Sequence, residues 1–259
     1  MDLGIAGRSA IVCASSAGLG RACAEALAAA GCTVVMNGRD AAALAEAAAA
    51  IRAAHGVRVT EVAGDVGEAS VQDALIAAAP DCDILVNNNG GPPPRDFRAV
   101  DGTALAAGIA ANFATPLALI QRVVDGMAAR KFGRIVNITS ASVKAPIAGL
   151  DLSSGARLGL TGFLAGVARQ VAKDGVTINF LLPGTFDTRR IAQLHAATAA
   201  RSDRNPAAVR SAAEAANPTR RLGDPVEFGA ACAFLCSSDA GYITGQSLLI
   251  DGGAFPGTL

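Results

Sequence analysis

Short runs of β-branched and other apolar residues alternate with alanine-rich stretches along nearly the whole chain. The runs predict seven strands, at Ser9–Cys13, Thr33–Asn37, Arg58–Val62, Ile84–Asn87, Arg134–Thr139, Thr177–Leu181 and Ser247–Ile250. Their apolar residues are not confined to alternate positions, which is typical of parallel strands covered by helices on both faces. The alternation therefore predicts an α/β fold with a doubly wound parallel sheet. Right-handed crossovers would place the carboxyl ends of all strands at one edge, where ligands bind.

The organisation along the chain predicts one domain, over residues 1–259. A chain of 259 residues with 51% hydrophobic side chains can bury one large core, and no linker rich in Pro, Gly or Ser divides it. The segment from about 186 to 222 interrupts the alternation with two weak helical runs, Thr188–Ala199 and Pro206–Ala216. Because this segment adjoins the ligand edge, we expect it to form a helical lid over the substrate.

Charge and composition exclude several classes of partner. The formal net charge is zero and no run of lysine or arginine stands out, which argues against a nucleic acid. Residues 1–4 lack the start of a signal peptide, and no stretch approaches the roughly 18 uninterrupted apolar residues of a membrane span. A cytoplasmic location without membrane contact is therefore expected. Six cysteines lie scattered in apolar runs, which indicates buried thiols and no metal site.

Gly18 and Gly20 follow the first expected strand and open the next helix. Glycine lets the backbone approach a pyrophosphate, and the N-terminus of a helix favours its negative charge. Two glycines alone are weak evidence, but their position directly after the first strand is the one that a dinucleotide-binding turn requires.

Further motifs in register with this turn give the chain a resemblance to the short-chain dehydrogenase/reductase family, in its β-ketoacyl-carrier-protein-reductase-like branch. The motifs, between about Arg8 and Gly253, are Cys13-Ala14-Ser15-Ser16-Ala17-Gly18-Leu19-Gly20, Asn87-Asn88-Asn89-Gly90, Asn112, Ser140, Pro183-Gly184, Thr244-Gly245-Gln246 and Asp251-Gly252-Gly253. The resemblance implies a Rossmann-like fold and hydride exchange between a nicotinamide cofactor and a carbonyl or alcohol. It also implies a homotetramer or dimer, formed through helices at about Thr103–Met127 and Ser154–Lys173 and the C-terminal strand.

The resemblance assigns the cofactor to residues spread over several loops. They are Ala14, Ser15, Ser16, Gly18, Leu19, Gly20, Arg39, Asp65, Val66, Asn88, Asn89, Gly90, Pro183, Gly184 and Thr188. Gly38 stands where members that prefer NAD place a carboxylate, and Arg39 can pair with a 2′-phosphate, so NADP(H) is expected. NAD(H), or no cofactor at all, is the alternative, with Arg39 as a solvated turn residue.

Two departures concern this cofactor site. Ala14 replaces the first glycine of the family's turn, and it should weaken cofactor binding if its backbone needs a positive φ. Asn89 replaces a small alanine beside the expected ribose position, where its amide would either add a hydrogen bond or crowd the site.

The largest departure is at the catalytic residues. Asn112 and Ser140 match the family's asparagine and serine, but Ser153 and Arg157 stand where its tyrosine and lysine belong. A serine hydroxyl is a much poorer acid than a phenol, which titrates near pH 10. Ser153 can instead join Ser140 in holding an oxyanion, and Arg157 offers ribose oxygens or a carboxylate a permanent charge. Tyr242, the only tyrosine, is expected to be structural.

These substitutions leave two other functions open beside an oxidoreductase with a modified proton path. One is a lyase or isomerase, with aldol-type or enolate chemistry and no redox step, that uses Ser140, Ser153 and Arg157. The other is a non-catalytic, nucleotide-binding partner subunit. His195, in the lid, is the one plausible replacement proton carrier, with a surface histidine without a role as the alternative.

The lid is rich in positive charge. Its arginines are Arg189, Arg190, Arg201, Arg204, Arg210, Arg220 and Arg221. Only Asp203 and Glu214 oppose them between Arg189 and Arg221, so this stretch carries a net charge of +5. The excess favours an acidic small-molecule substrate, such as a carboxylate, a phosphate or an acyl-carrier thioester, unless these arginines only keep the lid soluble. Together with His195 and Arg189, Pro92 in the stiff loop after the fourth strand is a candidate substrate contact.

Overall fold

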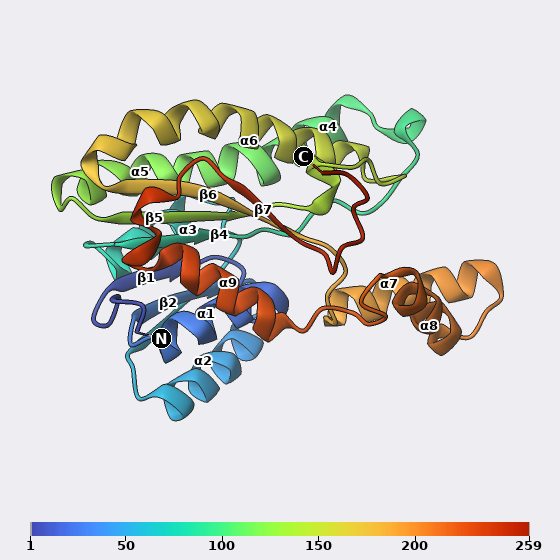
Figure 1. Ribbon diagram of the computed structural model, residues 1–259, viewed down its shortest axis with the longest axis horizontal. Helices are drawn as coiled ribbons and strands as arrows, with labels where there is room; N and C mark the ends of the chain where they lie inside the picture. Colours follow the sequence, from blue (N-terminus) through green and yellow to red (C-terminus); the bar gives the residue numbers. More distant parts are fainter. Residues whose placement is uncertain (1, 259) are drawn as a thin grey trace.

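Seven parallel strands form one sheet in the computed structural model, which describes residues 2–258 (Figure 1). They are β1 (Ser9–Val12), β2 (Thr33–Gly38), β3 (Val59–Ala63), β4 (Ile84–Asn87), β5 (Gly133–Ile138), β6 (Val176–Pro183) and β7 (Ser247–Ile250). Their order is β3-β2-β1-β4-β5-β6-β7, and every neighbouring pair is parallel. The predicted Rossmann-like, doubly wound sheet is confirmed, and the predicted strand ends differ by no more than two residues.

Helices cover both faces of the sheet. One face carries α1 (Gly18–Ala29), α2 (Ala41–His55) and α9 (Pro225–Cys236), and the other carries α3 (Ala69–Ala78), α5 (Thr115–Ala129) and α6 (Asp151–Val171). The central strands β4 and β5 are buried along their whole length, as predicted for strands covered on both sides. The edge strand β3 departs from that prediction: of its residues only Val59 is buried, because one side of the strand has no neighbour.

One helical run, Gly102–Ala129, has the length and apolar composition that would allow it to cross a membrane. It consists of α4 (Gly102–Ile109), a π-helical turn at Ala110–Ala114, and α5. Its side chains at Leu119, Ile120 and Met127 belong to the core between the sheet and the helices α3, α5 and α6. The apolar residues of α5 are thus explained by packing against the sheet.

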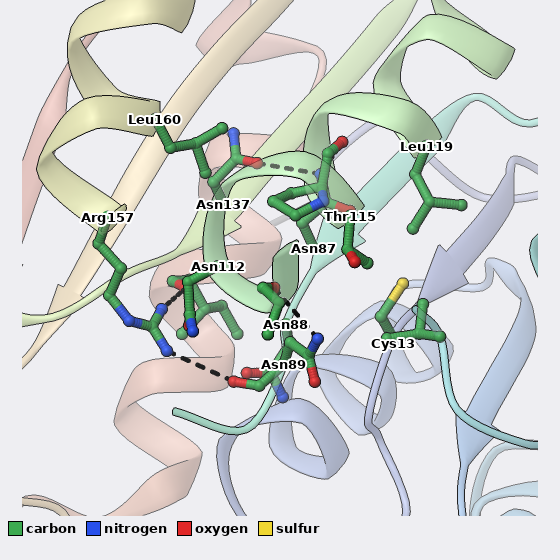
Figure 2. Close-up of a pocket in the computed structure, with 14 residues that line it drawn as sticks. Cys13, Asn87, Asn88, Asn89, Asn112, Thr115, Leu119, Asn137, Arg157 and Leu160 are labelled. Atoms are coloured by element: carbon green, nitrogen blue, oxygen red, sulfur yellow. Dashed lines mark hydrogen bonds between the residues drawn. The ribbon is translucent and has the colours of Figure 1, made fainter. Parts of the chain in front are cut away.

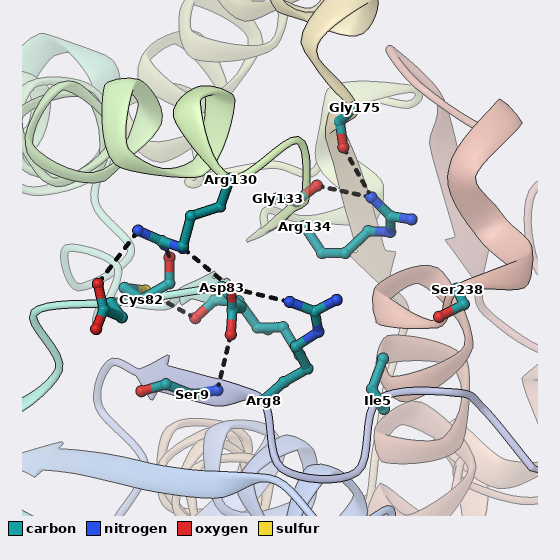
Figure 3. Close-up of polar contacts among 12 residues, drawn as sticks. Ile5, Arg8, Ser9, Cys82, Asp83, Arg130, Gly133, Arg134, Gly175 and Ser238 are labelled. Atoms are coloured by element: carbon teal, nitrogen blue, oxygen red, sulfur yellow. Dashed lines mark hydrogen bonds and ion pairs between the residues drawn. The ribbon is translucent and has the colours of Figure 1, made fainter.

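Polar side chains fasten the strands at their amino-terminal edge (Figure 3). Asp83, just before β4, accepts hydrogen bonds from the Ser9 backbone N–H (3.2 Å), from Arg8 Nη1 (3.4 Å) and from Arg130 Nε (3.4 Å). The buried Arg134 of β5 donates to the carbonyls of Ser237, Gly133 and Gly175. These contacts lie at the amino-terminal edge, opposite the carboxyl edge at which ligands bind in sheets of this kind.

The segment predicted as a lid forms two helices that stand off from the sheet beyond this edge (Figure 1). They are α7 (Arg189–Ser202) and α8 (Pro206–Ala216), and the bounds of α8 are those expected from the sequence. At the base of the lid, Phe186 pairs with Gly223 in an isolated β-bridge. Both ends of the segment are therefore held together where it leaves the body.

The cysteines and Tyr242 differ in how well their surroundings agree with the sequence. All six cysteines are buried thiols, as their apolar surroundings predicted. The structural role expected of Tyr242 has no support within a single chain, because its side chain is fully exposed, at 102% of its reference area. Tyr242 ends a short 3-10 helix that leads to the edge strand β7, where no further strand covers it.

Candidate active site

The loops after β1 and β4 meet at the point where the strand order reverses. Asn88 Nδ2, after β4, donates to the carbonyl oxygen of Ala14, after β1, at 3.1 Å. In doubly wound sheets ligands bind at this reversal, outside the carboxyl ends of the strands. A small cavity lies here, and Figure 2 shows Asn88 and Asn89 on one side of it with Asn112 and Arg157 facing them from helices.

The glycine-containing turn has the backbone geometry that its sequence predicted, with one strained residue. Ala14 has a φ of +45°, in the left-handed region that favours glycine, and Gly18 has a φ of +58°. The Ala14 N–H donates to Asn37 Oδ1 at 3.2 Å, which fixes the strained conformation. A Cβ on Gly20 would lie 2.4 Å from the Ala14 carbonyl oxygen, so only glycine fits there.

The residues expected at the pyrophosphate differ in how accessible they are. No side chain caps the first turn of α1, because Ala17 precedes it, and its backbone N–H groups point to the carboxyl edge. Leu19 and Ser16 are partly exposed beside this turn. Ser15, by contrast, is fully buried; its hydroxyl donates to the Val12 carbonyl at 2.8 Å. Ser15 therefore supports the turn from inside and does not face a ligand.

The end of β2 is suited to a phosphate more than to a carboxylate side chain. A Cβ on Gly38 would lie 3.0 Å from Ser16 Cβ and Oγ, so a longer side chain would have to displace Ser16. The neighbouring Arg39 is exposed, and no ion pair among residues 2–258 includes it. Arg39 thus presents a cation at the position where a 2′-phosphate would need one.

The remaining candidate cofactor residues surround the same crevice. Val66 lines the cavity, and the Asp65 carboxylate accepts from the Gly67 N–H at 2.8 Å. Thr188 faces the turn after β1, since its methyl group would lie 3.7 Å from a Cβ on Gly18. The other three candidates are exposed or partly exposed, with Gly90 in the loop after β4, Pro183 at the end of β6 and Gly184 directly after it.

Ser153 and Arg157 lie one turn apart on the buried face of α6. Arg157 Nε donates to Ser153 Oγ at 3.1 Å, Nη1 to the Ile138 carbonyl at 2.8 Å and Nη2 to the Asn89 carbonyl at 3.4 Å. Burial, together with the nearby charge of Arg190, lowers the pKa of Arg157 to about 10. Arg157 is therefore still positively charged at neutral pH, with hydroxyl and carbonyl oxygens in place of a carboxylate partner.

Ser140 lies two residues after the end of β5, and its hydroxyl, like that of Ser153, accepts hydrogen bonds from a neighbour. Ser140 Oγ accepts from the backbone N–H of Ser142 at 3.1 Å and from Ser142 Oγ at 2.9 Å. Since each hydroxyl already accepts from a neighbour, each can turn its own O–H toward a ligand. Two such donors match the requirement of an oxygen atom on which negative charge develops.

Asn112 comes from the π-helical turn at Ala110–Ala114, a type of irregularity found frequently at functional sites. Its Nδ2 donates to the Gly108 carbonyl at 3.3 Å. Its buried Oδ1 has no hydrogen-bond partner among residues 2–258, and the same is true of Asn87 Oδ1. Both residues line the cavity, whose volume of about 20 Å³ suits one water molecule. The cavity therefore has two buried amide oxygens without a protein partner among its lining residues.

The residues predicted as substrate contacts, His195, Arg189 and Pro92, differ in their exposure and are not joined to one another by hydrogen bonds in the described chain. His195 is partly buried on α7, where its charge adds to the hydrogen bonds from Arg210 that lower the pKa of Asp187. No hydrogen bond or ion pair among residues 2–258 joins His195 to the catalytic wall, which consists of Ser140, Ser153 and Arg157. Arg189 is exposed, and Pro92 is partly buried after Gly91.

Arg190 is the lid residue that borders the catalytic wall, although the sequence did not single it out. A Cβ on Gly91 would lie 3.4 Å from Arg190 Nη2 and 3.4 Å from Ser153 Oγ. The excess of lid arginines was the available signal, but it did not indicate which of them faces the site.

The positive charge of the lid is smaller than its sequence suggests. Arg210 forms ion pairs with Asp187 and Glu214, and Arg221 pairs with Glu227. These arginines stabilise the base of the lid, so they do not contribute an attractive field for a substrate.

Comparisons with known proteins extend over nearly the whole chain. Residues 13–254 match the family described as Enoyl-(Acyl carrier protein) reductase. Nodulation protein G of Azospirillum brasilense is 35% identical over 248 residues, which span 94% of this chain and 96% of that protein. Acetoacetyl-CoA reductase of Allochromatium vinosum is 33% identical over 253 residues, with 96% and 98% covered. The crystal structure of L-sorbose reductase from Gluconobacter frateurii, complexed with NADPH and L-sorbose, has a TM-score of 0.94 at 28% identity, with 99% and 100% covered.

Proposed function

The chain belongs to the short-chain dehydrogenase/reductase family, and from this premise we propose that it is an NADP(H)-dependent oxidoreductase of small carbonyl or alcohol substrates in which Ser153 and Arg157 replace the usual tyrosine and lysine. The observation that carries the proposal is the matched pair of hydroxyls. Ser140 and Ser153 both accept hydrogen bonds from neighbouring donors, and both keep an O–H to donate. This arrangement supports binding of a carbonyl oxygen.

The residues at the carboxyl edge fit NADP(H). The uncapped first turn of α1 and the positive φ of Gly18 suit a pyrophosphate. Arg39, exposed and without an ion-pair partner in the described chain, suits a 2′-phosphate, as does Gly38 in place of a carboxylate. The related L-sorbose reductase was solved with NADPH. When bound, NADP(H) supplies or accepts the hydride.

The chain's own residues then position the carbonyl and stabilise its oxygen. Ser140 Oγ and Ser153 Oγ donate to that oxygen, and their hydrogen bonds strengthen as it gains negative charge. Arg157 adds a fixed positive charge one turn away, in a buried site where charges are weakly screened. Arg157 keeps its proton at neutral pH and Ser153 is a weak acid, so the proton of the product hydroxyl comes from water. The unpartnered Oδ1 atoms of Asn112 and Asn87, which line the cavity, support a water in this role.

A binding titration followed by a hydride-transfer assay tests this proposal. The protein should bind NADPH more tightly than NADH, and it should oxidise NADPH in the presence of some members of a panel of aldehydes, ketones and oxo acids. Failure to bind any oxidised or reduced nicotinamide dinucleotide at millimolar concentration would overturn it. Turnover of a substrate without nucleotide would point instead to lyase or isomerase chemistry.

We further propose that the protein is a dimer or tetramer. α4 and α6 leave large apolar side chains exposed: Leu105 is 48%, Leu158 54% and Phe163 51% exposed. These helices lie in the two segments that the family resemblance assigns to subunit contacts. Light scattering should give a mass of two or four chains, and Leu158→Asp combined with Phe163→Asp should reduce it to one. A monomeric wild-type protein would contradict this proposal without affecting the proposed reaction.

A further inference from the structure

Three polar groups from two helices converge on Gly91, in the loop after β4. A Cβ on Gly91 would lie 3.4 Å from Arg190 Nη2, 3.4 Å from Ser153 Oγ and 3.7 Å from Arg157 Nη2. Arg190 comes from α7 in the lid, whereas Ser153 and Arg157 come from α6. Because Gly91 has no side chain, nothing on that residue covers these groups.

The two guanidinium groups lie near each other without an acidic neighbour. No ion pair among residues 2–258 includes Arg157 or Arg190, although Arg210 and Arg221 on the same lid segment are both paired. Arg190 acts on Arg157 as a like charge, since its proximity contributes to the lowered pKa of Arg157. Two close cations of which one is buried are stabilised when an anion binds between them.

We propose that Arg157 and Arg190 together bind a carboxylate of the substrate, next to the carbonyl that Ser140 and Ser153 hold. The substrate class is therefore a 2-oxo acid, or a 2-hydroxy acid in the opposite direction. A carboxylate directly bonded to the reacting carbon is required because Ser153 Oγ borders the same point as both guanidinium groups. Planar, bidentate donors such as these are well matched to a carboxylate.

This inference rests on the proposed function, because it names the substrate class of the same site. In the reductive direction the keto carbon gains a hydride and its oxygen gains a proton from water, while NADPH is oxidised to NADP⁺. The carboxylate is unchanged and stays on the two arginines. An acyl thioester has no charge at that position, so it would leave Arg157 and Arg190 without an anion.

The cofactor's phosphates are the other possible source of an anion. The candidate pyrophosphate site, at Gly18 and Gly20, follows β1, whereas Arg157 comes from α6 and Arg190 from α7 in the lid. We therefore assign the pair to the substrate, and the experiment separates the two sources.

The test measures the affinity of the NADP⁺-loaded protein for oxamate, an unreactive analogue of a 2-oxo acid, by isothermal titration calorimetry. Arg190→Gln should weaken oxamate binding about tenfold or more, the effect expected when a charged hydrogen bond is lost. Arg201→Gln removes the same charge from an exposed site on the same helix, and it should leave the affinity unchanged. Gly91→Val places a side chain between Arg190, Ser153 and Arg157 without changing any charge, and it should abolish oxamate binding. Melting temperatures close to that of the wild type would show that the variants fold.

The outcomes separate the inference from the proposed function. Equal oxamate affinities in Arg190→Gln and Arg201→Gln, or no oxamate binding by a wild-type protein that reduces neutral ketones, would overturn the inference alone. A loss of NADP⁺ affinity in Arg190→Gln would assign the arginine to the cofactor and would also overturn it. No binding of NADP⁺ by the wild type would remove the proposed function itself.

Discussion

Arg157 Nε donates to Ser153 Oγ at 3.1 Å, so the two residues that we propose as replacements for the family's tyrosine and lysine form a direct hydrogen bond across one turn of α6. The bond orients the serine hydroxyl and places a buried positive charge next to it. In the proposed function the pair stabilises negative charge and does not deliver a proton. Substitutions at the catalytic residues, at the cofactor site and in the core should therefore change kcat, cofactor affinity and stability in distinct ways.

Removal of either hydroxyl should slow hydride transfer without affecting the cofactor. We expect Ser140→Ala and Ser153→Ala each to lower kcat by about 10²- to 10³-fold, the effect of deleting one donor to a developing oxyanion. The dissociation constant of NADPH should stay within twofold, because neither hydroxyl lies at the glycine turn. Steady-state kinetics and fluorescence titration measure the two quantities. An unchanged kcat in both variants would place the carbonyl elsewhere.

Restoration of the family's pair tests the proton path. Ser153→Tyr with Arg157→Lys introduces a phenol, whose pKa a neighbouring cation lowers toward neutrality. We expect the double variant to preserve or raise NADPH-dependent turnover and to acquire an additional ionisation in its pH–rate profile. If the wild type has no turnover and the variant gains it, the native wall has lost redox chemistry, and the proposed function fails.

Arg39 should determine the preference for NADPH over NADH. Arg39→Ala removes the cation expected at the 2′-phosphate, and we expect a roughly tenfold loss of NADPH affinity, which corresponds to about 1.4 kcal/mol. The affinity for NADH, which lacks that phosphate, is the internal control and should not change. A parallel loss for both nucleotides would show that Arg39 acts on the fold of the turn.

The strained alanine of the cofactor turn offers a stabilising substitution. Ala14 has a φ of +45°, so Ala14→Gly should relieve strain and raise the free energy of unfolding by about 1 kcal/mol. Urea denaturation measures the change, and NADPH affinity should rise if the turn relaxes. Ala212→Gly, on the exposed face of α8, is the matched control and should destabilise by about 1 kcal/mol. Destabilisation by both substitutions would refute the strain at position 14.

The buried thiols should make the protein sensitive to alkali. Burial raises the pKa of Cys13, Cys32 and Cys82 to about 12, whereas thiols in the unfolded chain titrate near 9.0. Between these pH values the unfolded chain binds fewer protons, so the free energy of unfolding falls with rising pH by about 1.4 kcal/mol per unit for each thiol. Two arginines have the opposite effect at higher pH, because burial lowers the pKa of Arg157 to about 10 and also lowers the pKa of Arg134.

Urea melts under reducing conditions from pH 7.5 to 10.5 test this dependence. The slope should become shallower in Cys13→Ala combined with Cys82→Ala, since two of the titrating thiols are then absent. A stability that stays constant from pH 9 to 10.5 in the wild type would contradict the burial of these thiols.

The sequence indicates features that depend on neighbouring residues more reliably than those that depend on distant ones. Apolar runs located the strands, and the helical runs of the lid gave the bounds of α8, because both signals lie within one element. The burial of Ser15 was not visible, since it depends on Asn37 from another strand. The position of Arg190 beside Gly91 depends on a contact between segments a hundred residues apart in the chain.

The Asp83 cluster ties β1 to β4 at the edge of the sheet that is remote from the wall. These contacts help to fix the register of β1 and β4, and they do not depend on the loops and helix starts at the carboxyl edge. Substitutions at Ser153 and Arg157 would therefore leave this cluster of strand contacts intact. Positions 153 and 157 are therefore suitable sites for engineering a different reaction on this fold.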